Sequence, residues 1–193
     1  MIKIGVTGSL ASGKSTVVKL ISKRKYPIFD ADKIVSNLYK KRVFIKNIKK
    51  KFNIMNSKNL KKDIREILKK KTKKLKELEK NIHPFVKKEI NFFIKTKKRK
   101  KILIFDIPLL IESKLIKKFN IILFVSAKRN LRMRRYLKKG GSKKIFTILD
   151  KRQISPIKKL KKSDYVIYNN GSFKMLNKKT KIFIKKYEWN FFG

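Results

Sequence analysis

Short apolar runs alternate along the chain with longer stretches in which apolar residues recur every three or four positions. Two runs, "KILIFDIPLL" (101–110) and "IILFVSA" (121–127), are apolar enough to predict parallel strands covered on both faces. Shorter strands are expected at 2–6, at 26–32 ("YPIFDAD") and at 164–172 ("DYVIYNNGS"). Together these runs predict a parallel sheet of about five strands.

Helical spacing fills the segments between the expected strands. Apolar residues at helical positions predict a helix over 14–23 and another through "KIVSNLY", while the lysine-rich stretch 44–98 keeps the same spacing as a mostly helical insertion. Residues 128–162 are again helical and basic, with a turn at Gly140-Gly141, and a closing helix is expected over 173–187. Strands alternating with helices predict one α/β domain with right-handed connections.

The charge of the chain is extreme. Lys and Arg number 57 against 12 Asp and Glu, a net charge of +45, which raises nucleic acid, anionic membranes and acidic substrates as partners. The basic residues are spread from Lys3 to Lys186 and are mostly lysine, whereas base and phosphate recognition favours clustered arginine. Scarce alanine beside abundant Lys, Ile, Asn and Phe favours an A+T-rich coding sequence as the cause. Non-specific binding to nucleic acid is expected from the charge alone.

The lack of cysteine and the presence of a single histidine limit the kinds of catalytic and metal sites that the chain can form. The chain has no cysteine, which excludes disulfides, thiolate metal sites and cysteine nucleophiles. A Ser-His-Asp triad could form only around the single histidine, His83. The longest apolar runs are too short to span a bilayer, so we expect a cytoplasmic protein with no membrane partner.

The segment "GSLASGKS" (8–15) fits the pattern G-x-x-x-x-G-K-[ST], with a predicted strand before it and a predicted helix after it. Backbone amides of such a loop converge on phosphate, and Gly8 and Gly13 permit the close approach that a Cβ would obstruct. Lys14 is expected to reach the β- and γ-phosphates of ATP and Ser15 to bind Mg²⁺, while Thr16 is expected either to cap or to touch the α-phosphate. A glycine turn that only caps a helix would need neither the lysine nor the serine.

Aspartates follow two of the other predicted strands. Asp30 and Asp32 stand at the carboxyl end of 26–32, where ligands bind in open α/β sheets, and alternation along that strand would point only one of them inward. One of them could deprotonate an acceptor hydroxyl, or both could simply cap the next helix. Asp106 ends the run "KILIFD", where an aspartate can approach the metal directly or through water. It could equally begin a turn before Pro108.

Together these motifs resemble the dephospho-CoA kinase family over most of the chain, from Gly5 to about Gly171. The residues that carry the resemblance are "TGSLASGKS" at 7–15, Asp30-Ala31-Asp32, Leu78-Glu79 with His83-Pro84, Pro108-Leu109-Leu110 with Glu112, and Ser163-Asp164-Tyr165-Val166-Ile167 with Asn169-Asn170-Gly171. The phosphate loop is the specific motif, and the order of the other four supports it.

The resemblance implies a P-loop NTPase three-layer fold in which ATP phosphorylates the ribose 3′-hydroxyl of dephospho-CoA. The single domain, 1–193, would comprise a core (1–35, 101–127 and 163–193), a helical substrate subdomain (about 36–100) and a basic lid (about 128–150). The rival functions are a P-loop kinase for a nucleoside monophosphate or another small molecule, a basic nucleic-acid-binding ATPase, and an inactive member of the family.

The resemblance also implies roles for single residues. Asp32, Lys14 and Arg135 are expected to be catalytic, with Asp32 as the base and Arg135 as the lid cation, although neighbouring Arg134 fits nearly the same register. The other expected residues are, for the nucleotide, Gly8, Ala11, Ser12, Gly13, Ser15, Thr16, Lys139 and Asn170; for the acceptor, Asp30, His83, Pro108 and Leu109; and for the metal, Ser15 and Asp106. The alternative for His83 is a helix cap before Pro84.

The chain departs from the family pattern at three of these positions. Ser9 and Ala11 stand where glycines are usual, which affects the detailed fit of the loop. Lys139 replaces an arginine, and a lysine offers a point charge instead of a fork of donors.

Overall fold

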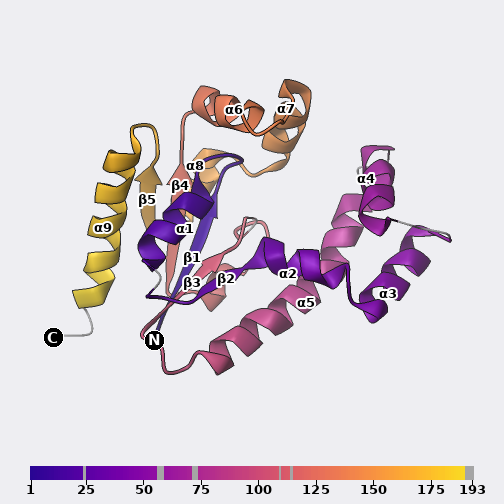
Figure 1. Ribbon diagram of the computed structural model, residues 1–193, viewed down its shortest axis with the longest axis horizontal. Helices are drawn as coiled ribbons and strands as arrows, with labels where there is room; N and C mark the ends of the chain where they lie inside the picture. Colours follow the sequence, from indigo (N-terminus) through magenta and orange to yellow (C-terminus); the bar gives the residue numbers. More distant parts are fainter. Residues whose placement is uncertain (24, 56–58, 71–73, 109, 114, 190–193) are drawn as a thin grey trace. The chain divides into compact units, whose positions relative to one another are not determined.

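The protein contains a parallel sheet, and its computed structural model describes residues 1–23, 25–55, 59–70, 74–108, 110–113 and 115–189. The five strands are β1 (Ile2–Gly8), β2 (Ile28–Asp30), β3 (Ile102–Asp106), β4 (Ile121–Ser126) and β5 (Tyr165–Tyr168), in the order β2-β3-β1-β4-β5 (Figure 1). The pairs β1–β3, β1–β4 and β4–β5 are parallel. The predicted α/β fold with five parallel strands is therefore confirmed.

The apolar runs became strands because both of their faces are covered. Every residue of β3 and the four central residues of β4 are buried, which explains why these segments are continuous rather than alternating in hydrophobicity. Helices α1 (Lys14–Ser22) and α9 (Phe173–Trp189) pack against each other and against the sheet through one apolar cluster that includes Val17, Ile21 and Phe183. This packing fixes the position of the loop between β1 and α1.

The chain divides into two compact units, residues 1–29 with 97–193 and residues 30–96. The first also contains the short 3₁₀ helix η1 (Ile116–Lys118) and helices α6 (Arg129–Leu137), α7 (Lys143–Arg152) and α8 (Pro156–Lys161). The second unit consists of α2 (Ala31–Leu38), α3 (Arg42–Phe52), α4 (Leu60–Lys70) and α5 (Lys74–Thr96). Its own core includes Leu38, Phe44, Ile48, Phe52, Ile64 and Leu78. The predicted helical character of 44–98 and 128–162 is confirmed, and the role of each unit stays a prediction.

The second strand is shorter than its sequence predicts. It ends at Asp30, and α2 begins at the next residue because the Asp30 carboxylate accepts a hydrogen bond from the Lys33 amide at 2.9 Å. Asp32 therefore lies in the first turn of a helix. The expectation that strand alternation separates the two aspartates is wrong, both because Asp32 is outside the strand and because residues two apart on a strand point to the same face. The apolar residues of "YPIF" favour a strand in the sequence. The strand ends at Asp30 because this residue is the N-cap of the next helix.

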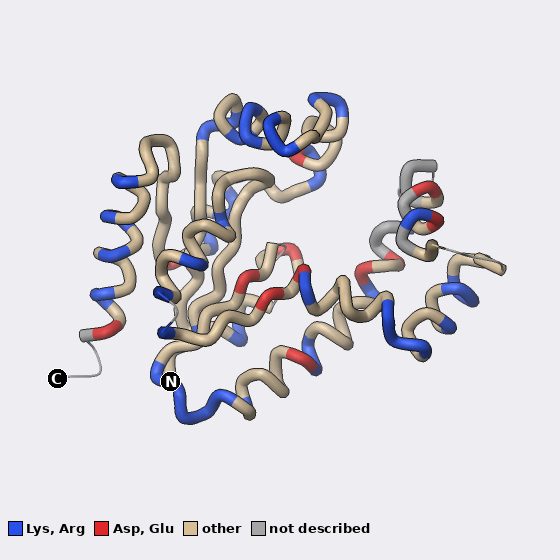
Figure 2. The backbone as a smooth tube through the Cα atoms, viewed as in Figure 1, with Lys and Arg blue, Asp and Glu red and all other residues tan. Residues whose placement is uncertain are grey.

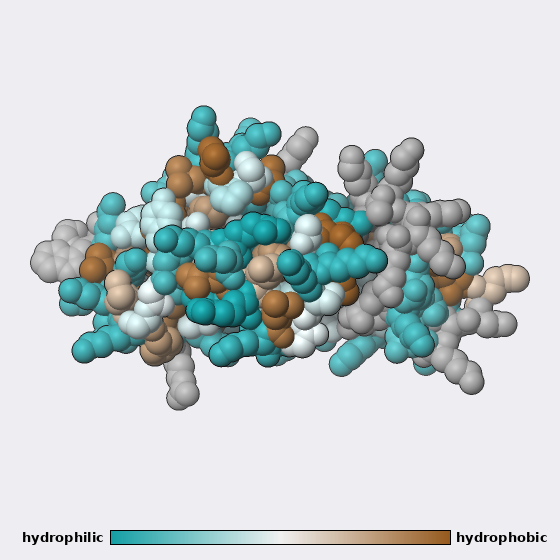
Figure 3. Space-filling view, turned by 90° about the horizontal axis from the view of Figure 1, so that it is seen from above, coloured by the Kyte–Doolittle hydropathy of each residue, from teal (hydrophilic) through white to brown (hydrophobic). Residues whose placement is uncertain are grey.

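Charged side chains are distributed over the surface rather than gathered on one element. Figure 2 shows Lys and Arg along helices such as α3, α6 and α9. The face seen in Figure 3 is largely hydrophilic, with apolar residues scattered among the charged ones. Among the described residues, no helix combines the length and the hydropathy that a membrane crossing requires.

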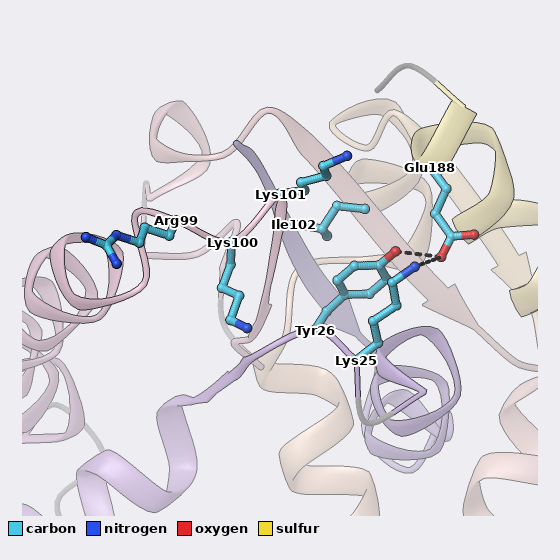
Figure 4. Close-up of a pocket in the computed structure, with 7 residues that line it drawn as sticks. All are labelled: Lys25, Tyr26, Arg99, Lys100, Lys101, Ile102 and Glu188. Carbon is cyan, nitrogen blue, oxygen red and sulfur yellow. Dashed lines mark hydrogen bonds and ion pairs between the residues drawn. The ribbon is translucent and has the colours of Figure 1, made fainter. Parts of the chain in front are cut away.

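A hydrogen bond ties the C-terminal helix to the segment that leads into β2. The Tyr26 hydroxyl donates to Glu188 Oε1 at 2.5 Å, with Lys25 Nζ 3.7 Å from the same oxygen, beside a cavity of about 280 Å³ (Figure 4). The hydrogen bond from Tyr26 lowers the pKa of Glu188, and burial, assisted by Glu188, raises the pKa of Tyr26. At neutral pH the phenol is therefore neutral and donates to an ionised Glu188.

Replacing Tyr26 with phenylalanine is expected to lower the free energy of unfolding by about 1.5–3 kcal/mol at neutral pH, because a hydrogen bond to a charged acceptor is lost while the ring remains. A carboxyl with a lowered pKa stabilises the fold above its ordinary pKa, and this contribution disappears as the pH falls through the lowered value. Urea unfolding of both proteins across this range should show their difference shrinking in acid. A difference that is constant with pH would contradict the role of Glu188.

Candidate active site

The segment between β1 and α1 forms a tight loop. The Ser12 amide donates to the Ser9 carbonyl at 3.0 Å, and Gly13 is the N-cap of α1 with φ +92°. Ala11 also has a positive φ, +58°. The predicted order of strand, glycine loop and helix is therefore confirmed, and the glycine at 13 is required by the backbone.

The N-terminus of α1 is suited to an anion. The helix has no side-chain cap at Gly13, and its first-turn amides, including those of Ser15 and Thr16, have no acceptor within the helix. The helix dipole adds partial positive charge at the same end. Ser12 Oγ is buried and has no hydrogen-bond partner among the described residues, so the loop retains polar capacity that a bound phosphate could use.

Lys14 and Asp106 form an ion pair at the base of the loop, between Nζ and Oδ1. Their side chains are only 13% and 9% exposed, so each charge needs the other to offset its desolvation. Asp106 reaches this place because it ends β3, in register with Val6 of β1. The next segment is anchored to β1 as well, since Thr7 Oγ1 donates to the Pro108 carbonyl at 3.1 Å. Leu109, which we expected at the acceptor, lies outside the described residues.

Of the two arginines expected to provide the lid cation, Arg135 is the one whose contacts with the loop are observed. Its guanidinium donates to the Ser12 carbonyl at 3.4 Å and to the Asn169 carbonyl at 3.0 Å, whereas Arg134 and Lys139 are exposed. The geometry thus favours Arg135 over Arg134 as the cation beside the loop. Lys139 follows α6 in a turn, where its amide donates to the Tyr136 carbonyl at 3.1 Å.

Asn169 forms a hydrogen bond with the loop, a contact that the sequence pattern did not predict. Its side-chain Nδ2 donates to the Ser12 carbonyl at 2.8 Å, and the residue is buried. Asn170, the predicted nucleotide residue, instead accepts a hydrogen bond from the Lys128 amide at 2.9 Å through its Oδ1. The two asparagines are adjacent and follow the same strand, so only their orientation in the structure separates them.

The possible metal ligands are oxygen donors. The Ser15 hydroxyl is exposed in the first turn of α1, and the Asp106 carboxylate ends β3 beside Lys14. Oxygen ligands suit Mg²⁺, which usually takes one or two protein groups together with phosphate oxygens and water. The described residues contain no group of three or more His, Asp or Glu side chains that would hold a metal without a nucleotide. The donor set therefore fits an ion that arrives with the phosphates.

Three of the predicted site residues belong to the second unit. Asp30 caps α2, Asp32 is exposed in the first turn of that helix, and His83 is exposed within α5. Helix α5 continues through Pro84 to Thr96, so the alternative that His83 caps a helix before the proline is wrong. Because the His83 side chain is exposed, it is accessible to a ligand, and its predicted role at the acceptor stays a prediction.

Replacing Gly13 with alanine is expected to weaken ATP binding by more than about tenfold, because a left-handed alanine alone costs about 1–2 kcal/mol. In addition, its Cβ would lie 2.3 Å from Asn169 Nδ2. Calorimetric titration with ATP measures the loss. The matched control is Gly140→Ala, at φ +79°, where the new Cβ has no atom of the described residues within 4 Å; it carries the same backbone strain without the clash and should lose less ATP affinity than Gly13→Ala. Equal losses in both variants would contradict the packing argument.

Comparisons with known proteins agree with one another. The family model described as CoaE, dephospho-CoA kinase, matches residues 2–175. A dephospho-CoA kinase of Fusobacterium nucleatum is 36% identical over 187 residues, which cover 93% of this chain and 95% of that protein. The structure of TT1252 from Thermus thermophilus superposes with a TM-score of 0.82 at 25% identity, over 96% of this chain and 97% of that one. A dephospho-CoA kinase from Campylobacter jejuni, at 23% identity and a TM-score of 0.71 over 97% and 98% of the two chains, shares the fold.

Proposed function

The chain belongs to the dephospho-CoA kinase family, and from this premise we propose that it transfers the γ-phosphoryl group of ATP to the ribose 3′-hydroxyl of dephospho-CoA. The acceptor oxygen loses its proton and bonds to the γ-phosphorus, the bond to the β,γ-bridging oxygen breaks, and coenzyme A and ADP are the products. The single observation that carries the proposal in this structure is the glycine loop at the start of α1, with the Lys14–Asp106 pair at its base.

The nucleotide phosphates are assigned to the loop. Backbone amides in the first turn of α1, including those of Ser15 and Thr16, and the positive end of that helix would hold them, as anions are held at helix N-termini. Lys14 already lies at the base of the loop, paired with Asp106, and phosphate oxygens would give its ammonium a second set of partners. Arg135, fixed on the Ser12 carbonyl, places a further positive charge beside the loop. Such charges lower the barrier because they stabilise the transferring phosphoryl group.

Asp32 is assigned as the catalytic base. Its carboxylate is exposed at the start of α2, and the Asp30 cap fixes where that helix begins. A carboxylate that accepts the proton of the acceptor hydroxyl is a recurrent part of kinase sites. The acceptor residues expected from the sequence, Asp30, His83, Pro108 and Leu109, complete the proposed acceptor site, and the second unit is proposed as the substrate subdomain.

Mg²⁺ is part of the proposal. Ser15 and Asp106 would hold it, directly or through water, and when bound it neutralises phosphate charge. The proposal also includes a cytoplasmic location, where ATP is supplied, and the segment of about 128–150 as the lid over the phosphates.

An acceptor panel tests the proposed function. ADP release is measured with ATP and Mg²⁺ in the presence of dephospho-CoA, AMP, pantothenate or no acceptor. Turnover with dephospho-CoA alone is expected. Turnover with AMP would instead indicate a nucleoside monophosphate kinase, and ATP hydrolysis stimulated only by nucleic acid would indicate the basic ATPase.

A further inference from the structure

The peptide groups of Leu10, in the loop between β1 and α1, are held by residues from outside the loop. The Leu10 amide donates to Gln153 Oε1 at 3.1 Å, and the Leu10 carbonyl accepts from Arg132 Nη1 at 3.3 Å. Gln153 ends helix α7 and Arg132 lies in α6. Both polar groups of one loop residue are therefore bound by the segment that follows β4.

A buried ion pair holds the Gln153 acceptor in place. Lys159 is fully buried, and its Nζ lies 3.4 Å from Gln153 Oε1 and 3.0 Å from Glu112 Oε1. A buried lysine is tolerated only with such partners, and they leave its ammonium little freedom to move. The proposed transfer reaction assigns no role to Lys159. Its ammonium nevertheless contacts Gln153, which in turn accepts a hydrogen bond from the Leu10 amide of the loop.

Other groups also hold Arg132, which contacts the Leu10 carbonyl, in place. Arg132 is 3% exposed, and its guanidinium donates to Asp150 Oδ1 at 2.5 Å and to the Ala127 carbonyl at 3.1 Å. Asp150 lies in the last turn of α7, three residues before Gln153. The end of α7 thus supports both contacts to Leu10.

The residue after Leu10 explains why the loop needs support. Ala11 has φ +58°, in the left-handed region that alanine avoids and glycine enters freely. Such residues persist where the surrounding structure leaves the backbone no alternative. In the family that the sequence resembles, a glycine is usual at this position, so this chain carries a strain that a glycine would not.

We propose that Glu112, Lys159 and Gln153, together with Asp150 and Arg132, form a brace that keeps Ala11 in its left-handed conformation and the loop ready for ATP. Gln153 is then a positioning residue, acting on ATP through the Leu10 amide. The inference rests on the proposed function, since it takes ATP as the ligand of the loop.

A double-mutant cycle between Gln153 and Ala11 tests the brace. Calorimetric titration with ATP and Mg²⁺, without an acceptor, is carried out on the wild-type chain, Gln153→Met, Ala11→Gly and the double variant. Methionine fills much of the glutamine's volume but cannot accept from the Leu10 amide. We expect Gln153→Met to weaken ATP binding about tenfold, since a strained alanine costs about that factor, and the same change to cost less than about threefold once residue 11 is glycine.

Two control variants show whether Gln153→Met weakens ATP binding through the lost hydrogen bond to Leu10 or through a general loss of folding. Gln153→Glu keeps an acceptor oxygen and is expected to bind ATP within about threefold of the wild-type chain, and Lys151→Met, an exposed neighbour in α7, is expected to bind it unchanged. Thermal unfolding of each variant shows whether it is folded, and Gln153→Ala replaces Gln153→Met in the cycle if the latter is not.

The outcomes distinguish the two proposals. Equal losses from Gln153→Met with alanine and with glycine at position 11, or no loss at all, would overturn the brace while leaving the kinase assignment intact. A folded wild-type chain that binds no ATP would overturn the proposed function itself.

Discussion

Replacing Asp32 with asparagine is expected to lower kcat by about a hundred- to ten-thousand-fold, the range over which a positioned general base contributes. Asparagine has nearly the same size but cannot take the proton of the acceptor hydroxyl. Because the nucleotide phosphates are assigned to the loop between β1 and α1, the affinity for ATP should change little. Steady-state kinetics with dephospho-CoA and calorimetric titration with ATP separate these two effects.

A second carboxylate of the same unit provides the control for Asp32. Asp63 lies in the first turn of α4, as Asp32 lies in the first turn of α2, and both are acidic residues at a helix start. Asp63→Asn should keep kcat within about twofold, since Asp63 is half-buried, has no role in the proposed transfer, and asparagine keeps nearly the same size. Equal losses in the two variants, or full activity of Asp32→Asn, would remove Asp32 from the mechanism.

Replacing Lys14 with arginine is expected to lower kcat/KM by about a hundred- to a thousand-fold, because it removes the ammonium that the proposed mechanism assigns to the developing charge of the phosphoryl group. Arginine keeps the positive charge opposite Asp106, whose side chain is 9% exposed, so the fold should survive. The planar guanidinium cannot occupy the place of the compact ammonium. Kinetics and thermal unfolding on the same preparation test both statements.

Lys14→Met shows what the charge contributes to stability. It leaves the buried Asp106 carboxylate without its cation, which costs about 3–5 kcal/mol when the surroundings do not relax. We therefore expect a lower unfolding temperature in addition to lost activity. An unfolding temperature equal to that of Lys14→Arg would mean that the ion pair does not stabilise the loop, and retained activity in Lys14→Arg would contradict the assigned role.

Much of the fold could be predicted from the sequence because its signals are local. Continuous apolar runs mark β3 and β4, which are buried on both faces, and the glycine pattern with Lys14 marks the loop before α1. The length of β2 could not be predicted, since it depended on which of two aspartates would cap the next helix. The structure selects Asp30, whose carboxylate accepts from the Lys33 amide.

The contacts that hold the loop could not be predicted for a different reason. Arg132, Gln153 and Asn169 reach the loop from positions more than a hundred residues away in the chain. In a segment this rich in basic residues, a buried arginine has the same local sequence pattern as its exposed neighbours. Asn169 and Asn170 likewise differ only in the direction that the end of β5 gives them.

The large positive charge does not by itself indicate a partner. Lys and Arg occur along helices of both units, and none of the described elements gathers them to the exclusion of the rest (Figure 2). Recognition of a specific nucleic acid would favour a focused patch with interleaved aromatic residues. Non-specific binding at low salt stays a prediction from the charge alone, and it should fall steeply as salt is added.

The fate of the γ-phosphoryl group tests the central claim most directly. The chain is incubated with Mg²⁺, dephospho-CoA and ATP radiolabelled on its γ-phosphate, and the product is then treated with a phosphatase specific for ribose 3′-phosphates. We predict that the label enters coenzyme A and is released by this phosphatase, and that Asp32→Asn forms almost none of this product. Label found only in inorganic phosphate, or in a product that the phosphatase does not attack, would contradict the proposed transfer.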